Sequence, residues 1–133
     1  MRRLWIVAAG LNGLAAVAVG AAVQHVWTDD TPRVLLAENA VRYGLPHAAA
    51  LLTLGVLPIP TRKLARGLLA AAGSSLALGV TLFAGTLYIL AAGALPELML
   101  AVPVGGSLMI LGWGLLLAYG AALGRERAAS AHE

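Results

Sequence analysis

Cysteine is absent from this 133-residue sequence, and charged residues make up only 11% of it. The first absence excludes disulfides, thiolate chemistry and zinc sites built on cysteine. The second excludes an ordinary soluble domain, in which about 25% of residues are charged, because so few charges cannot cover a globular surface. The hydrophobic share of 60% and the mean hydropathy of +0.86 indicate a chain whose apolar surface needs lipid.

Recognisable catalytic motifs are also lacking. The sequence has no Ser/His/Asp arrangement with a supporting motif, no HExxH and no phosphate-binding loop. A proton-coupled exporter needs an acidic side chain in mid-membrane, whereas Glu38 and Glu97 are expected at or above the outer surface. We therefore expect no enzymatic activity, no cofactor and no small multidrug transporter. The net charge of +3 does not indicate a nucleic-acid partner, because the basic residues lie between apolar runs.

Long apolar runs are what the chain does have. Each is near the roughly 20 residues that cross a bilayer. They predict an all-α membrane protein with a single four-helix transmembrane domain at residues 1–124 and a polar cytoplasmic tail at 125–133. The expected spans are about residues 4–27, 32–58, 65–93 and 97–123. A cleavable signal peptide is the alternative for the first run, but that run exceeds the usual 7–15-residue signal core, and further spans follow.

Proline and glycine mark the ends of these runs. Thr31 followed by Pro32 is a favourable helix start, and Pro58-Ile59-Pro60 ends the second span. Pro46 lies inside that span and has no N–H for the carbonyl of Arg42, so we expect a kink or local break there. Whether it only kinks the helix or separates a surface helix from the span stays open. Gly93 to Glu97 is the expected turn before the fourth span.

The basic residues predict the orientation. With a cytoplasmic N-terminus, the inner segments carry seven of the nine basic residues: Arg2, Arg3, Arg62, Lys63, Arg66, Arg125 and Arg127. The positive-inside rule then places both termini in the cytoplasm of a bacterial inner membrane. The run Arg62–Arg66 is interpreted as this orientation signal, with an anionic-lipid patch as the alternative.

The candidate site is a polar stripe. Asn39, Tyr43 and His47 are spaced four apart, so on a helix each lies about one turn from the next. His25 and Tyr88 are expected at the same outer half of the membrane, which gives a candidate polar pocket lined by all five. Since an unpartnered polar group in hydrocarbon is costly, His47 should face the bundle interior and be hydrogen-bonded.

Three interpretations of His47 follow from its position. The first is structural: Tyr43, a carbonyl near Pro46 or a water satisfies the imidazole. The second is a ligand or proton site. The third, a metal or haem site shared with His25, is disfavoured by an expected height difference of about 12 Å. Elsewhere, Asn12 is interpreted as a contact between helices, and Ser75 with Gly79 as a place of close helix approach.

Four stretches resemble the YgdD-like family of small membrane proteins, catalogued as domain of unknown function 423 and related to transmembrane protein 256. Their order along the chain is that of the family patterns GAxGAH, YQxxHALALL, LFSGSLY and TPxGG…GW. The matching stretches are Gly20–His25, Tyr43 with His47–Leu52, Leu82–Tyr88, and Pro103–Gly106 with Gly112-Trp113. The resemblance implies a four-helix inner-membrane protein and no known activity.

Two positions depart from those patterns. Gly44 follows Tyr43 where the family usually has Gln, and Val23-Gln24 stands where a Gly-Ala pair is usual. A polar site that depends on the family's Gln is therefore altered here. We expect a non-enzymatic structural or accessory membrane protein whose partners are membrane lipids and a larger complex or further copies of itself. The alternative is a binding or transport module with an outer-leaflet pocket for a lipid or small hydrophobic molecule.

Overall fold

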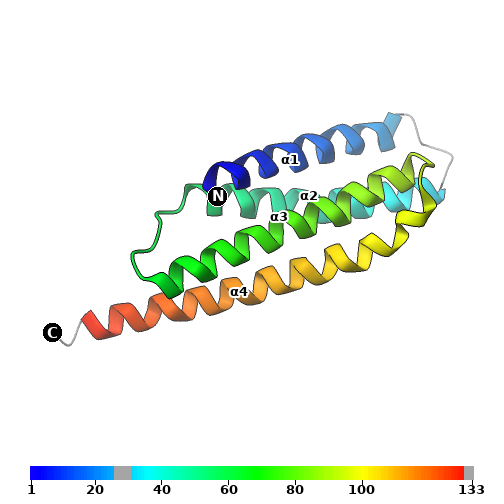
Figure 1. The fold of residues 1–133 in the computed structure, drawn as a ribbon. Coiled ribbons are helices and arrows are strands. Elements are labelled where there is room, and N and C mark those ends of the chain that lie inside the picture. Colours follow the sequence, from blue (N-terminus) through cyan, green and yellow to red (C-terminus); the bar gives the residue numbers. More distant parts are fainter. Residues whose placement is uncertain (26–30, 131–133) are drawn as a thin grey trace.

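The computed structural model of the chain describes residues 1–25 and 31–130. In these ranges the chain is helical and has no strand, which confirms the all-α class. Its elements are α1 (Arg2–His25), α2 (Thr31–Val56), α3 (Lys63–Ala91), the short 3-10 helix η1 (Pro96–Leu100) and α4 (Ala101–Ser130). The four long helices lie side by side (Figure 1), and the N-terminal end of α1 shares one end of the bundle with the C-terminal end of α4.

The helix boundaries lie close to those expected from the sequence. The spans predicted at 32–58 and 65–93 correspond to α2 and α3, shifted by one or two residues. The predicted end of the first span at residue 27 and the link through Asp30 fall outside the described residues. Helix α4 continues to Ser130, beyond the apolar segment that ends at Leu123. Most of the predicted polar tail therefore extends the last helix, because Arg, Glu and Ala are good helix formers in water.

Pro46 does not interrupt α2, which is one helix from Thr31 to Val56. The expected local break is absent, and no separate surface helix precedes the span. Only the hydrogen bond to the Arg42 carbonyl is lost to the proline ring. Helix α2 packs along both α1 and α3 on either side of this position.

The turn after α3 follows from Gly93. Its φ of +79° is left-handed, and its N–H donates to the Leu90 carbonyl while the Ala94 N–H donates to the Ile89 carbonyl. These two bonds are those of a Schellman motif, in which glycine is the favoured residue at the left-handed position. The predicted turn is thus confirmed, and η1 leads from it into α4.

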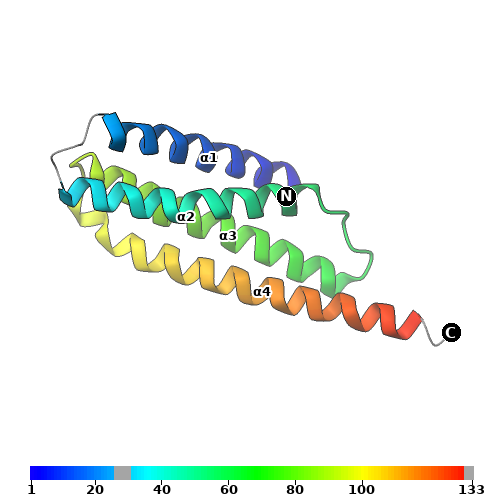
Figure 2. The ribbon, with the colours of Figure 1, turned by 180° about the vertical axis from the view of Figure 1, so that it is seen from behind.

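The helices form an open arrangement rather than a closed ring. Figures 1 and 2 place α1 and α4 at opposite edges, with α2 and α3 between them. Helix α3 packs against each of the other three. In the described part of the chain, no α-carbon of α2 comes within 8 Å of one in α4. Contact between α2 and α4 therefore depends on side chains that cross this gap.

Small residues let α3 and α4 approach closely. A Cβ added at Gly105 would lie 2.6 Å from the Phe83 backbone nitrogen and 2.8 Å from the Gly79 oxygen, and one at Gly79 would lie 2.8 Å from the Met109 nitrogen. A Cβ at Gly112 would overlap the side chain of Leu76. We call Gly79, Gly105 and Gly112 the glycine seam. It confirms that Gly79 lies at a close helix approach.

Three segments are long and apolar enough to cross a membrane: Arg2–His25, Lys63–Ala91 and Pro96–Leu123. Helix α2 is as long but falls short in hydropathy, because Arg33, Glu38, Arg42 and His47 all lie within it. The described part of the chain thus has three candidate spans by length and composition, and the fourth span stays a prediction.

Candidate functional site

His47 lies between helices with both ring nitrogens hydrogen-bonded. Its side chain is 7% exposed. The Nδ1 atom is 2.8 Å from the Tyr43 carbonyl oxygen one turn earlier on α2, and the Trp113 indole N–H of α4 donates to Nε2 over 3.1 Å. The two rings meet edge to face, with centroids 5.9 Å apart. This confirms the prediction that the imidazole faces the interior and has partners.

The two partners of His47 indicate its tautomer. A carbonyl oxygen can only accept and an indole N–H can only donate. Nδ1 must therefore carry the proton and Nε2 must offer its lone pair, which is the neutral Nδ1–H tautomer. An imidazolium has N–H groups at both positions and could not accept from Trp113. The geometry favours the structural interpretation of His47, because neither nitrogen is left for a ligand.

The His47–Trp113 pair closes the gap between α2 and α4. Their backbones stay apart, and this hydrogen bond joins residues 66 positions apart in the chain. From the sequence, Gly112-Trp113 stood out only as part of a family motif, and its pairing with His47 was not predicted. The expected depths of the two residues on α2 and α4, which run in the same direction, were the available signal.

The predicted stripe turns away from the interior along α2. Four residues on a helix advance by about 400°, so each step rotates the side chain by about 40°. His47 is buried, Tyr43 is 44% exposed with its ring edge against Phe83 at a centroid distance of 5.0 Å, and Asn39 is exposed. The three side chains therefore follow one stripe along α2 but do not line one common pocket. Asn39 also lies about two turns from His47.

His25 and Tyr88 also differ in exposure. His25 is exposed at the end of α1. The Tyr88 hydroxyl is buried and is, among the described residues, the buried side-chain polar atom that has no hydrogen-bond partner. A Cβ at Gly44 would lie 3.3 Å from this oxygen, so a longer side chain at position 44 would point at it. The glycine that departs from the family pattern thus borders an unpartnered hydroxyl.

Asn12 links α1 to α3. Its side chain is buried, and its amide nitrogen donates to the Thr81 hydroxyl over 3.2 Å and to the Ala8 carbonyl over 2.9 Å. Inter-helix hydrogen bonds of this kind contribute about 0.6 kcal/mol on average in membrane proteins. The interpretation of Asn12 as a contact between helices is confirmed.

Arg2 has a role that the sequence analysis did not assign. Its Nε donates to the Gly55 carbonyl over 2.9 Å, and Nη2 donates to the Val56 carbonyl over 3.1 Å. These are the last residues of α2, whose terminal carbonyls have no partner within the helix. A cation there also interacts favourably with the negative end of the helix dipole. Arg2 therefore ties the start of α1 to the end of α2.

The described residues include no group of three or more His, Cys, Asp or Glu side chains that could hold a metal ion. His25 and His47, the pair considered from sequence, differ in exposure, and both nitrogens of His47 are engaged. The side chains gathered here join helices to one another.

Comparisons with known proteins agree with the motifs. The profile of a family described as "Protein of unknown function (DUF423)" matches residues 19–106. A UPF0382 membrane protein of Haemophilus influenzae is 30% identical over 122 residues, covering 90% of this chain and 94% of the relative. One from Staphylococcus aureus is 32% identical over 117 residues, covering 86% and 93%, and YwdK of Bacillus subtilis is 28% identical, covering 86% and 94%. No solved structure matches significantly.

Proposed function

This chain belongs to the DUF423 family of small membrane proteins, and we propose that it is a non-enzymatic structural or accessory protein of the bacterial inner membrane. The observation that carries the proposal is the use of two buried polar side chains and of Arg2 at the end of the bundle. Asn12, His47 and Arg2 each bond to another helix or terminal carbonyl of the same chain. Such groups hold a scaffold together and leave little to act on a substrate.

Four spans with both termini in the cytoplasm are part of this proposal. Helix α2 starts near the end of α1 and finishes near the start of α3, and it lies along both (Figure 1). If α1 and α3 cross the bilayer, α2 must cross as well to connect them. Arg2, Arg3, Arg62, Lys63 and Arg66 then gather on the cytoplasmic side.

Single-cysteine labelling tests this topology cleanly, because the chain has no cysteine of its own. Gln24→Cys and Ala94→Cys should react with a membrane-impermeant maleimide in intact spheroplasts. Thr61→Cys, in the connection between α2 and α3, should react only after the membrane is opened. Labelling of Gln24→Cys and Thr61→Cys from the same side would exclude a spanning α2.

The outward face of α4 is where we expect a partner helix. In the described residues the backbone of α4 lies close to α3 and η1, while Ile110 and Leu117 are 76% and 78% exposed. A Cβ at Gly114 would meet no atom within 4 Å. Together with Ala118 it forms a small-xxx-small pair that admits another transmembrane helix, from a complex subunit or a second copy.

Replacing Gly114 with leucine should dissociate this assembly without unfolding the chain. After mild detergent extraction from its own membrane, the wild-type protein should migrate on a blue native gel well above its 13.5 kDa. Gly114→Leu should migrate as a single copy, because the bulky side chain prevents close approach. Gly10→Leu is the matched control, since Gly10 is also exposed with no atom within 4 Å, and it should leave the assembly intact. A wild-type protein that runs as a monomer would contradict the proposal.

A binding module with an outer-leaflet pocket is the second candidate, favoured by the unpartnered Tyr88 hydroxyl. A small molecule held there should be visible by native mass spectrometry of the extracted protein. Tyr88→Phe removes the hydroxyl and little else, so it should abolish the adduct if the hydroxyl binds the ligand. A wild-type protein without an adduct would favour the structural role.

A further inference from the structure

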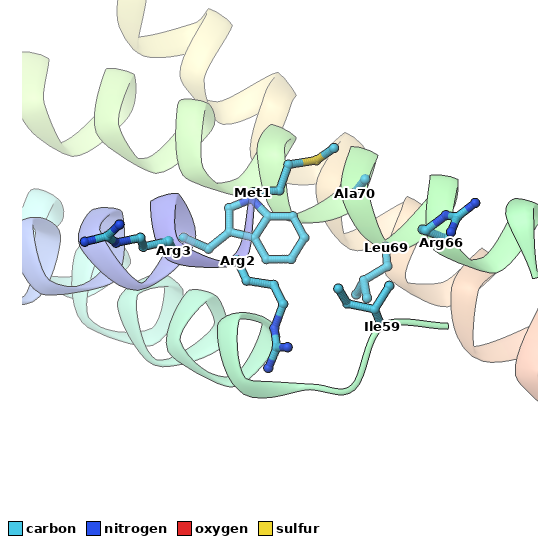
Figure 3. Close-up of a pocket in the computed structure, with 8 residues that line it drawn as sticks. Met1, Arg2, Arg3, Ile59, Arg66, Leu69 and Ala70 are labelled. Carbon is cyan, nitrogen blue, oxygen red and sulfur yellow. The ribbon is translucent and has the colours of Figure 1, made fainter. Parts of the chain in front are cut away.

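A cavity of about 400 Å³ opens at the end of the bundle where α1 and α3 begin. Its apolar part includes Trp5, Ile59 and Leu69, and its basic part is Arg2, Arg3 and Arg66. Figure 3 shows Leu69 and Ile59 close together, with Arg3 and Arg66 extending to either side. We call this the arginine cavity.

The positive charge around the arginine cavity is not balanced by the described part of the chain. Arg2 donates its hydrogen bonds to the last carbonyls of α2. Arg3 and Arg66 are exposed and form no ion pair with a described residue. The described acidic side chains, Glu38 and Glu97, lie toward the other end of the bundle. Helices α1 and α3 both begin here with no acidic residue in the first turn, so no carboxylate of those turns offsets the arginines.

The arginine cavity lies at the level of lipid headgroups. The apolar run of α1 begins at Leu4, directly after Arg3, and that of α3 begins directly after Arg66. Their guanidinium groups are therefore at the boundary between hydrocarbon and water. Basic pockets between helices at this depth suit anionic headgroups, and arginine suits phosphate because its planar fork can make two parallel hydrogen bonds.

An apolar groove continues from the arginine cavity into the membrane. It has a volume of about 350 Å³ and runs between α1 and α3, lined by Leu4, Ala8, Ala77 and Leu78 among others. Met1 and Trp5 line both the groove and the cavity, so the two are adjoining. A free phosphate would use only the cavity, whereas a phospholipid would use both.

We infer that this end of the bundle is a specific site for an anionic phospholipid. Its phosphate lies at the mouth of the arginine cavity between Arg3 and Arg66, and one acyl chain lies in the groove between α1 and α3. The site is separate from the outward face of α4 on which the proposed assembly depends. A loss of lipid binding can therefore occur without a loss of the assembly, and a loss of the assembly can occur without a loss of lipid binding.

Native mass spectrometry of the full chain, released from nanodiscs containing equal amounts of phosphatidylglycerol and phosphatidylcholine, tests this site. One phosphatidylglycerol should remain bound in preference to phosphatidylcholine. Each arginine near an anionic group should contribute about fivefold in affinity, so Arg3→Gln with Arg66→Gln should weaken retention by about 25-fold. Arg2, Arg62 and Lys63 remain to preserve the orientation.

A charge-matched control separates the site from general attraction to an anionic membrane. Lys63→Gln with Arg42→Gln removes the same charge from positions that do not line the cavity, and it should leave retention unchanged. Equal loss in both double variants, or equal retention of the two lipids, would overturn the proposal.

Filling the groove distinguishes a phospholipid from a free anion. Ala77→Phe places a ring where the acyl chain is expected and should reduce phosphatidylglycerol retention with all the arginines present. Glycerol phosphate added in excess should not displace the lipid, because it cannot use the groove. Displacement by glycerol phosphate, together with full retention in Ala77→Phe, would show an anion site only and would overturn the lipid assignment.

Discussion

Replacing Gly105 with alanine is expected to lower the free energy of unfolding by about 2–3 kcal/mol, the upper part of the range for overpacked interiors. The added methyl group would lie 2.6 Å from the Phe83 nitrogen and 2.8 Å from the Gly79 oxygen. Both are backbone atoms, which cannot rotate away as a side chain can, so α3 and α4 must separate. Unfolding by SDS titration in mixed micelles, followed by circular dichroism, measures the loss.

Gly114→Ala is the control, because it makes the same chemical change on the same helix. Its methyl group would meet no atom of the chain within 4 Å. Alanine is the better helix former by up to about 1 kcal/mol, so this variant should be as stable as the wild-type protein or slightly more stable. Equal destabilisation by the two substitutions would mean that the glycine seam does not determine how α3 and α4 pack.

The helices themselves could be predicted from the sequence because their signals are local. An apolar run of about 20 residues predicts a helix of membrane-spanning length, and Pro58, Pro60 and Gly93 mark ends that the structure confirms to within a few residues. The turn at Gly93 is a local matter too, since a left-handed φ there is easily adopted by glycine. At Pro46 the structure excludes the local break, because α2 continues through it, while the kink stays a prediction.

The direction of each side chain around its helix was harder to predict. Asn39 and His47 share a stripe by spacing, but two steps of about 40° turn them about 80° apart. Asn39 is exposed and His47 is buried as a result. The spacing of the residues predicts this rotation, but it does not predict which edge of the stripe faces the neighbouring helices.

Pairings between side chains of different helices were the hardest to predict. The bond from Trp113 to His47 and the bonds from Arg2 to Gly55 and Val56 depend on which helices adjoin. Four helices that alternate in direction can be arranged in several ways with the same apolar runs. The hydrogen-bond partners of a buried histidine can therefore be named only once it is known which helices are neighbours.

His47→Ala is expected to lower the free energy of unfolding by about 3 kcal/mol. Truncating a large buried side chain to alanine typically costs about 2–5 kcal/mol, and here the Trp113 N–H would also lose its acceptor at membrane depth. Trp113→Phe keeps an aromatic ring and should cost only about 1 kcal/mol. Thr53→Ala is the control on α2: Thr53 is exposed and bonds within its own helix to the Ala49 carbonyl, so its loss should be below about 0.5 kcal/mol.

A double-mutant cycle isolates the bond that closes the gap between α2 and α4. Combining His47→Leu with Trp113→Phe should give a coupling of about 0.6 kcal/mol, with about 1.7 kcal/mol as the upper limit seen for such bonds. Nitrogen-15 NMR of the His47 ring should show the proton on Nδ1, since Nε2 must accept from Trp113. Additive losses together with a proton on Nε2 would mean that the two helices are held by packing through α3 alone, and the imidazole would then be available for another partner.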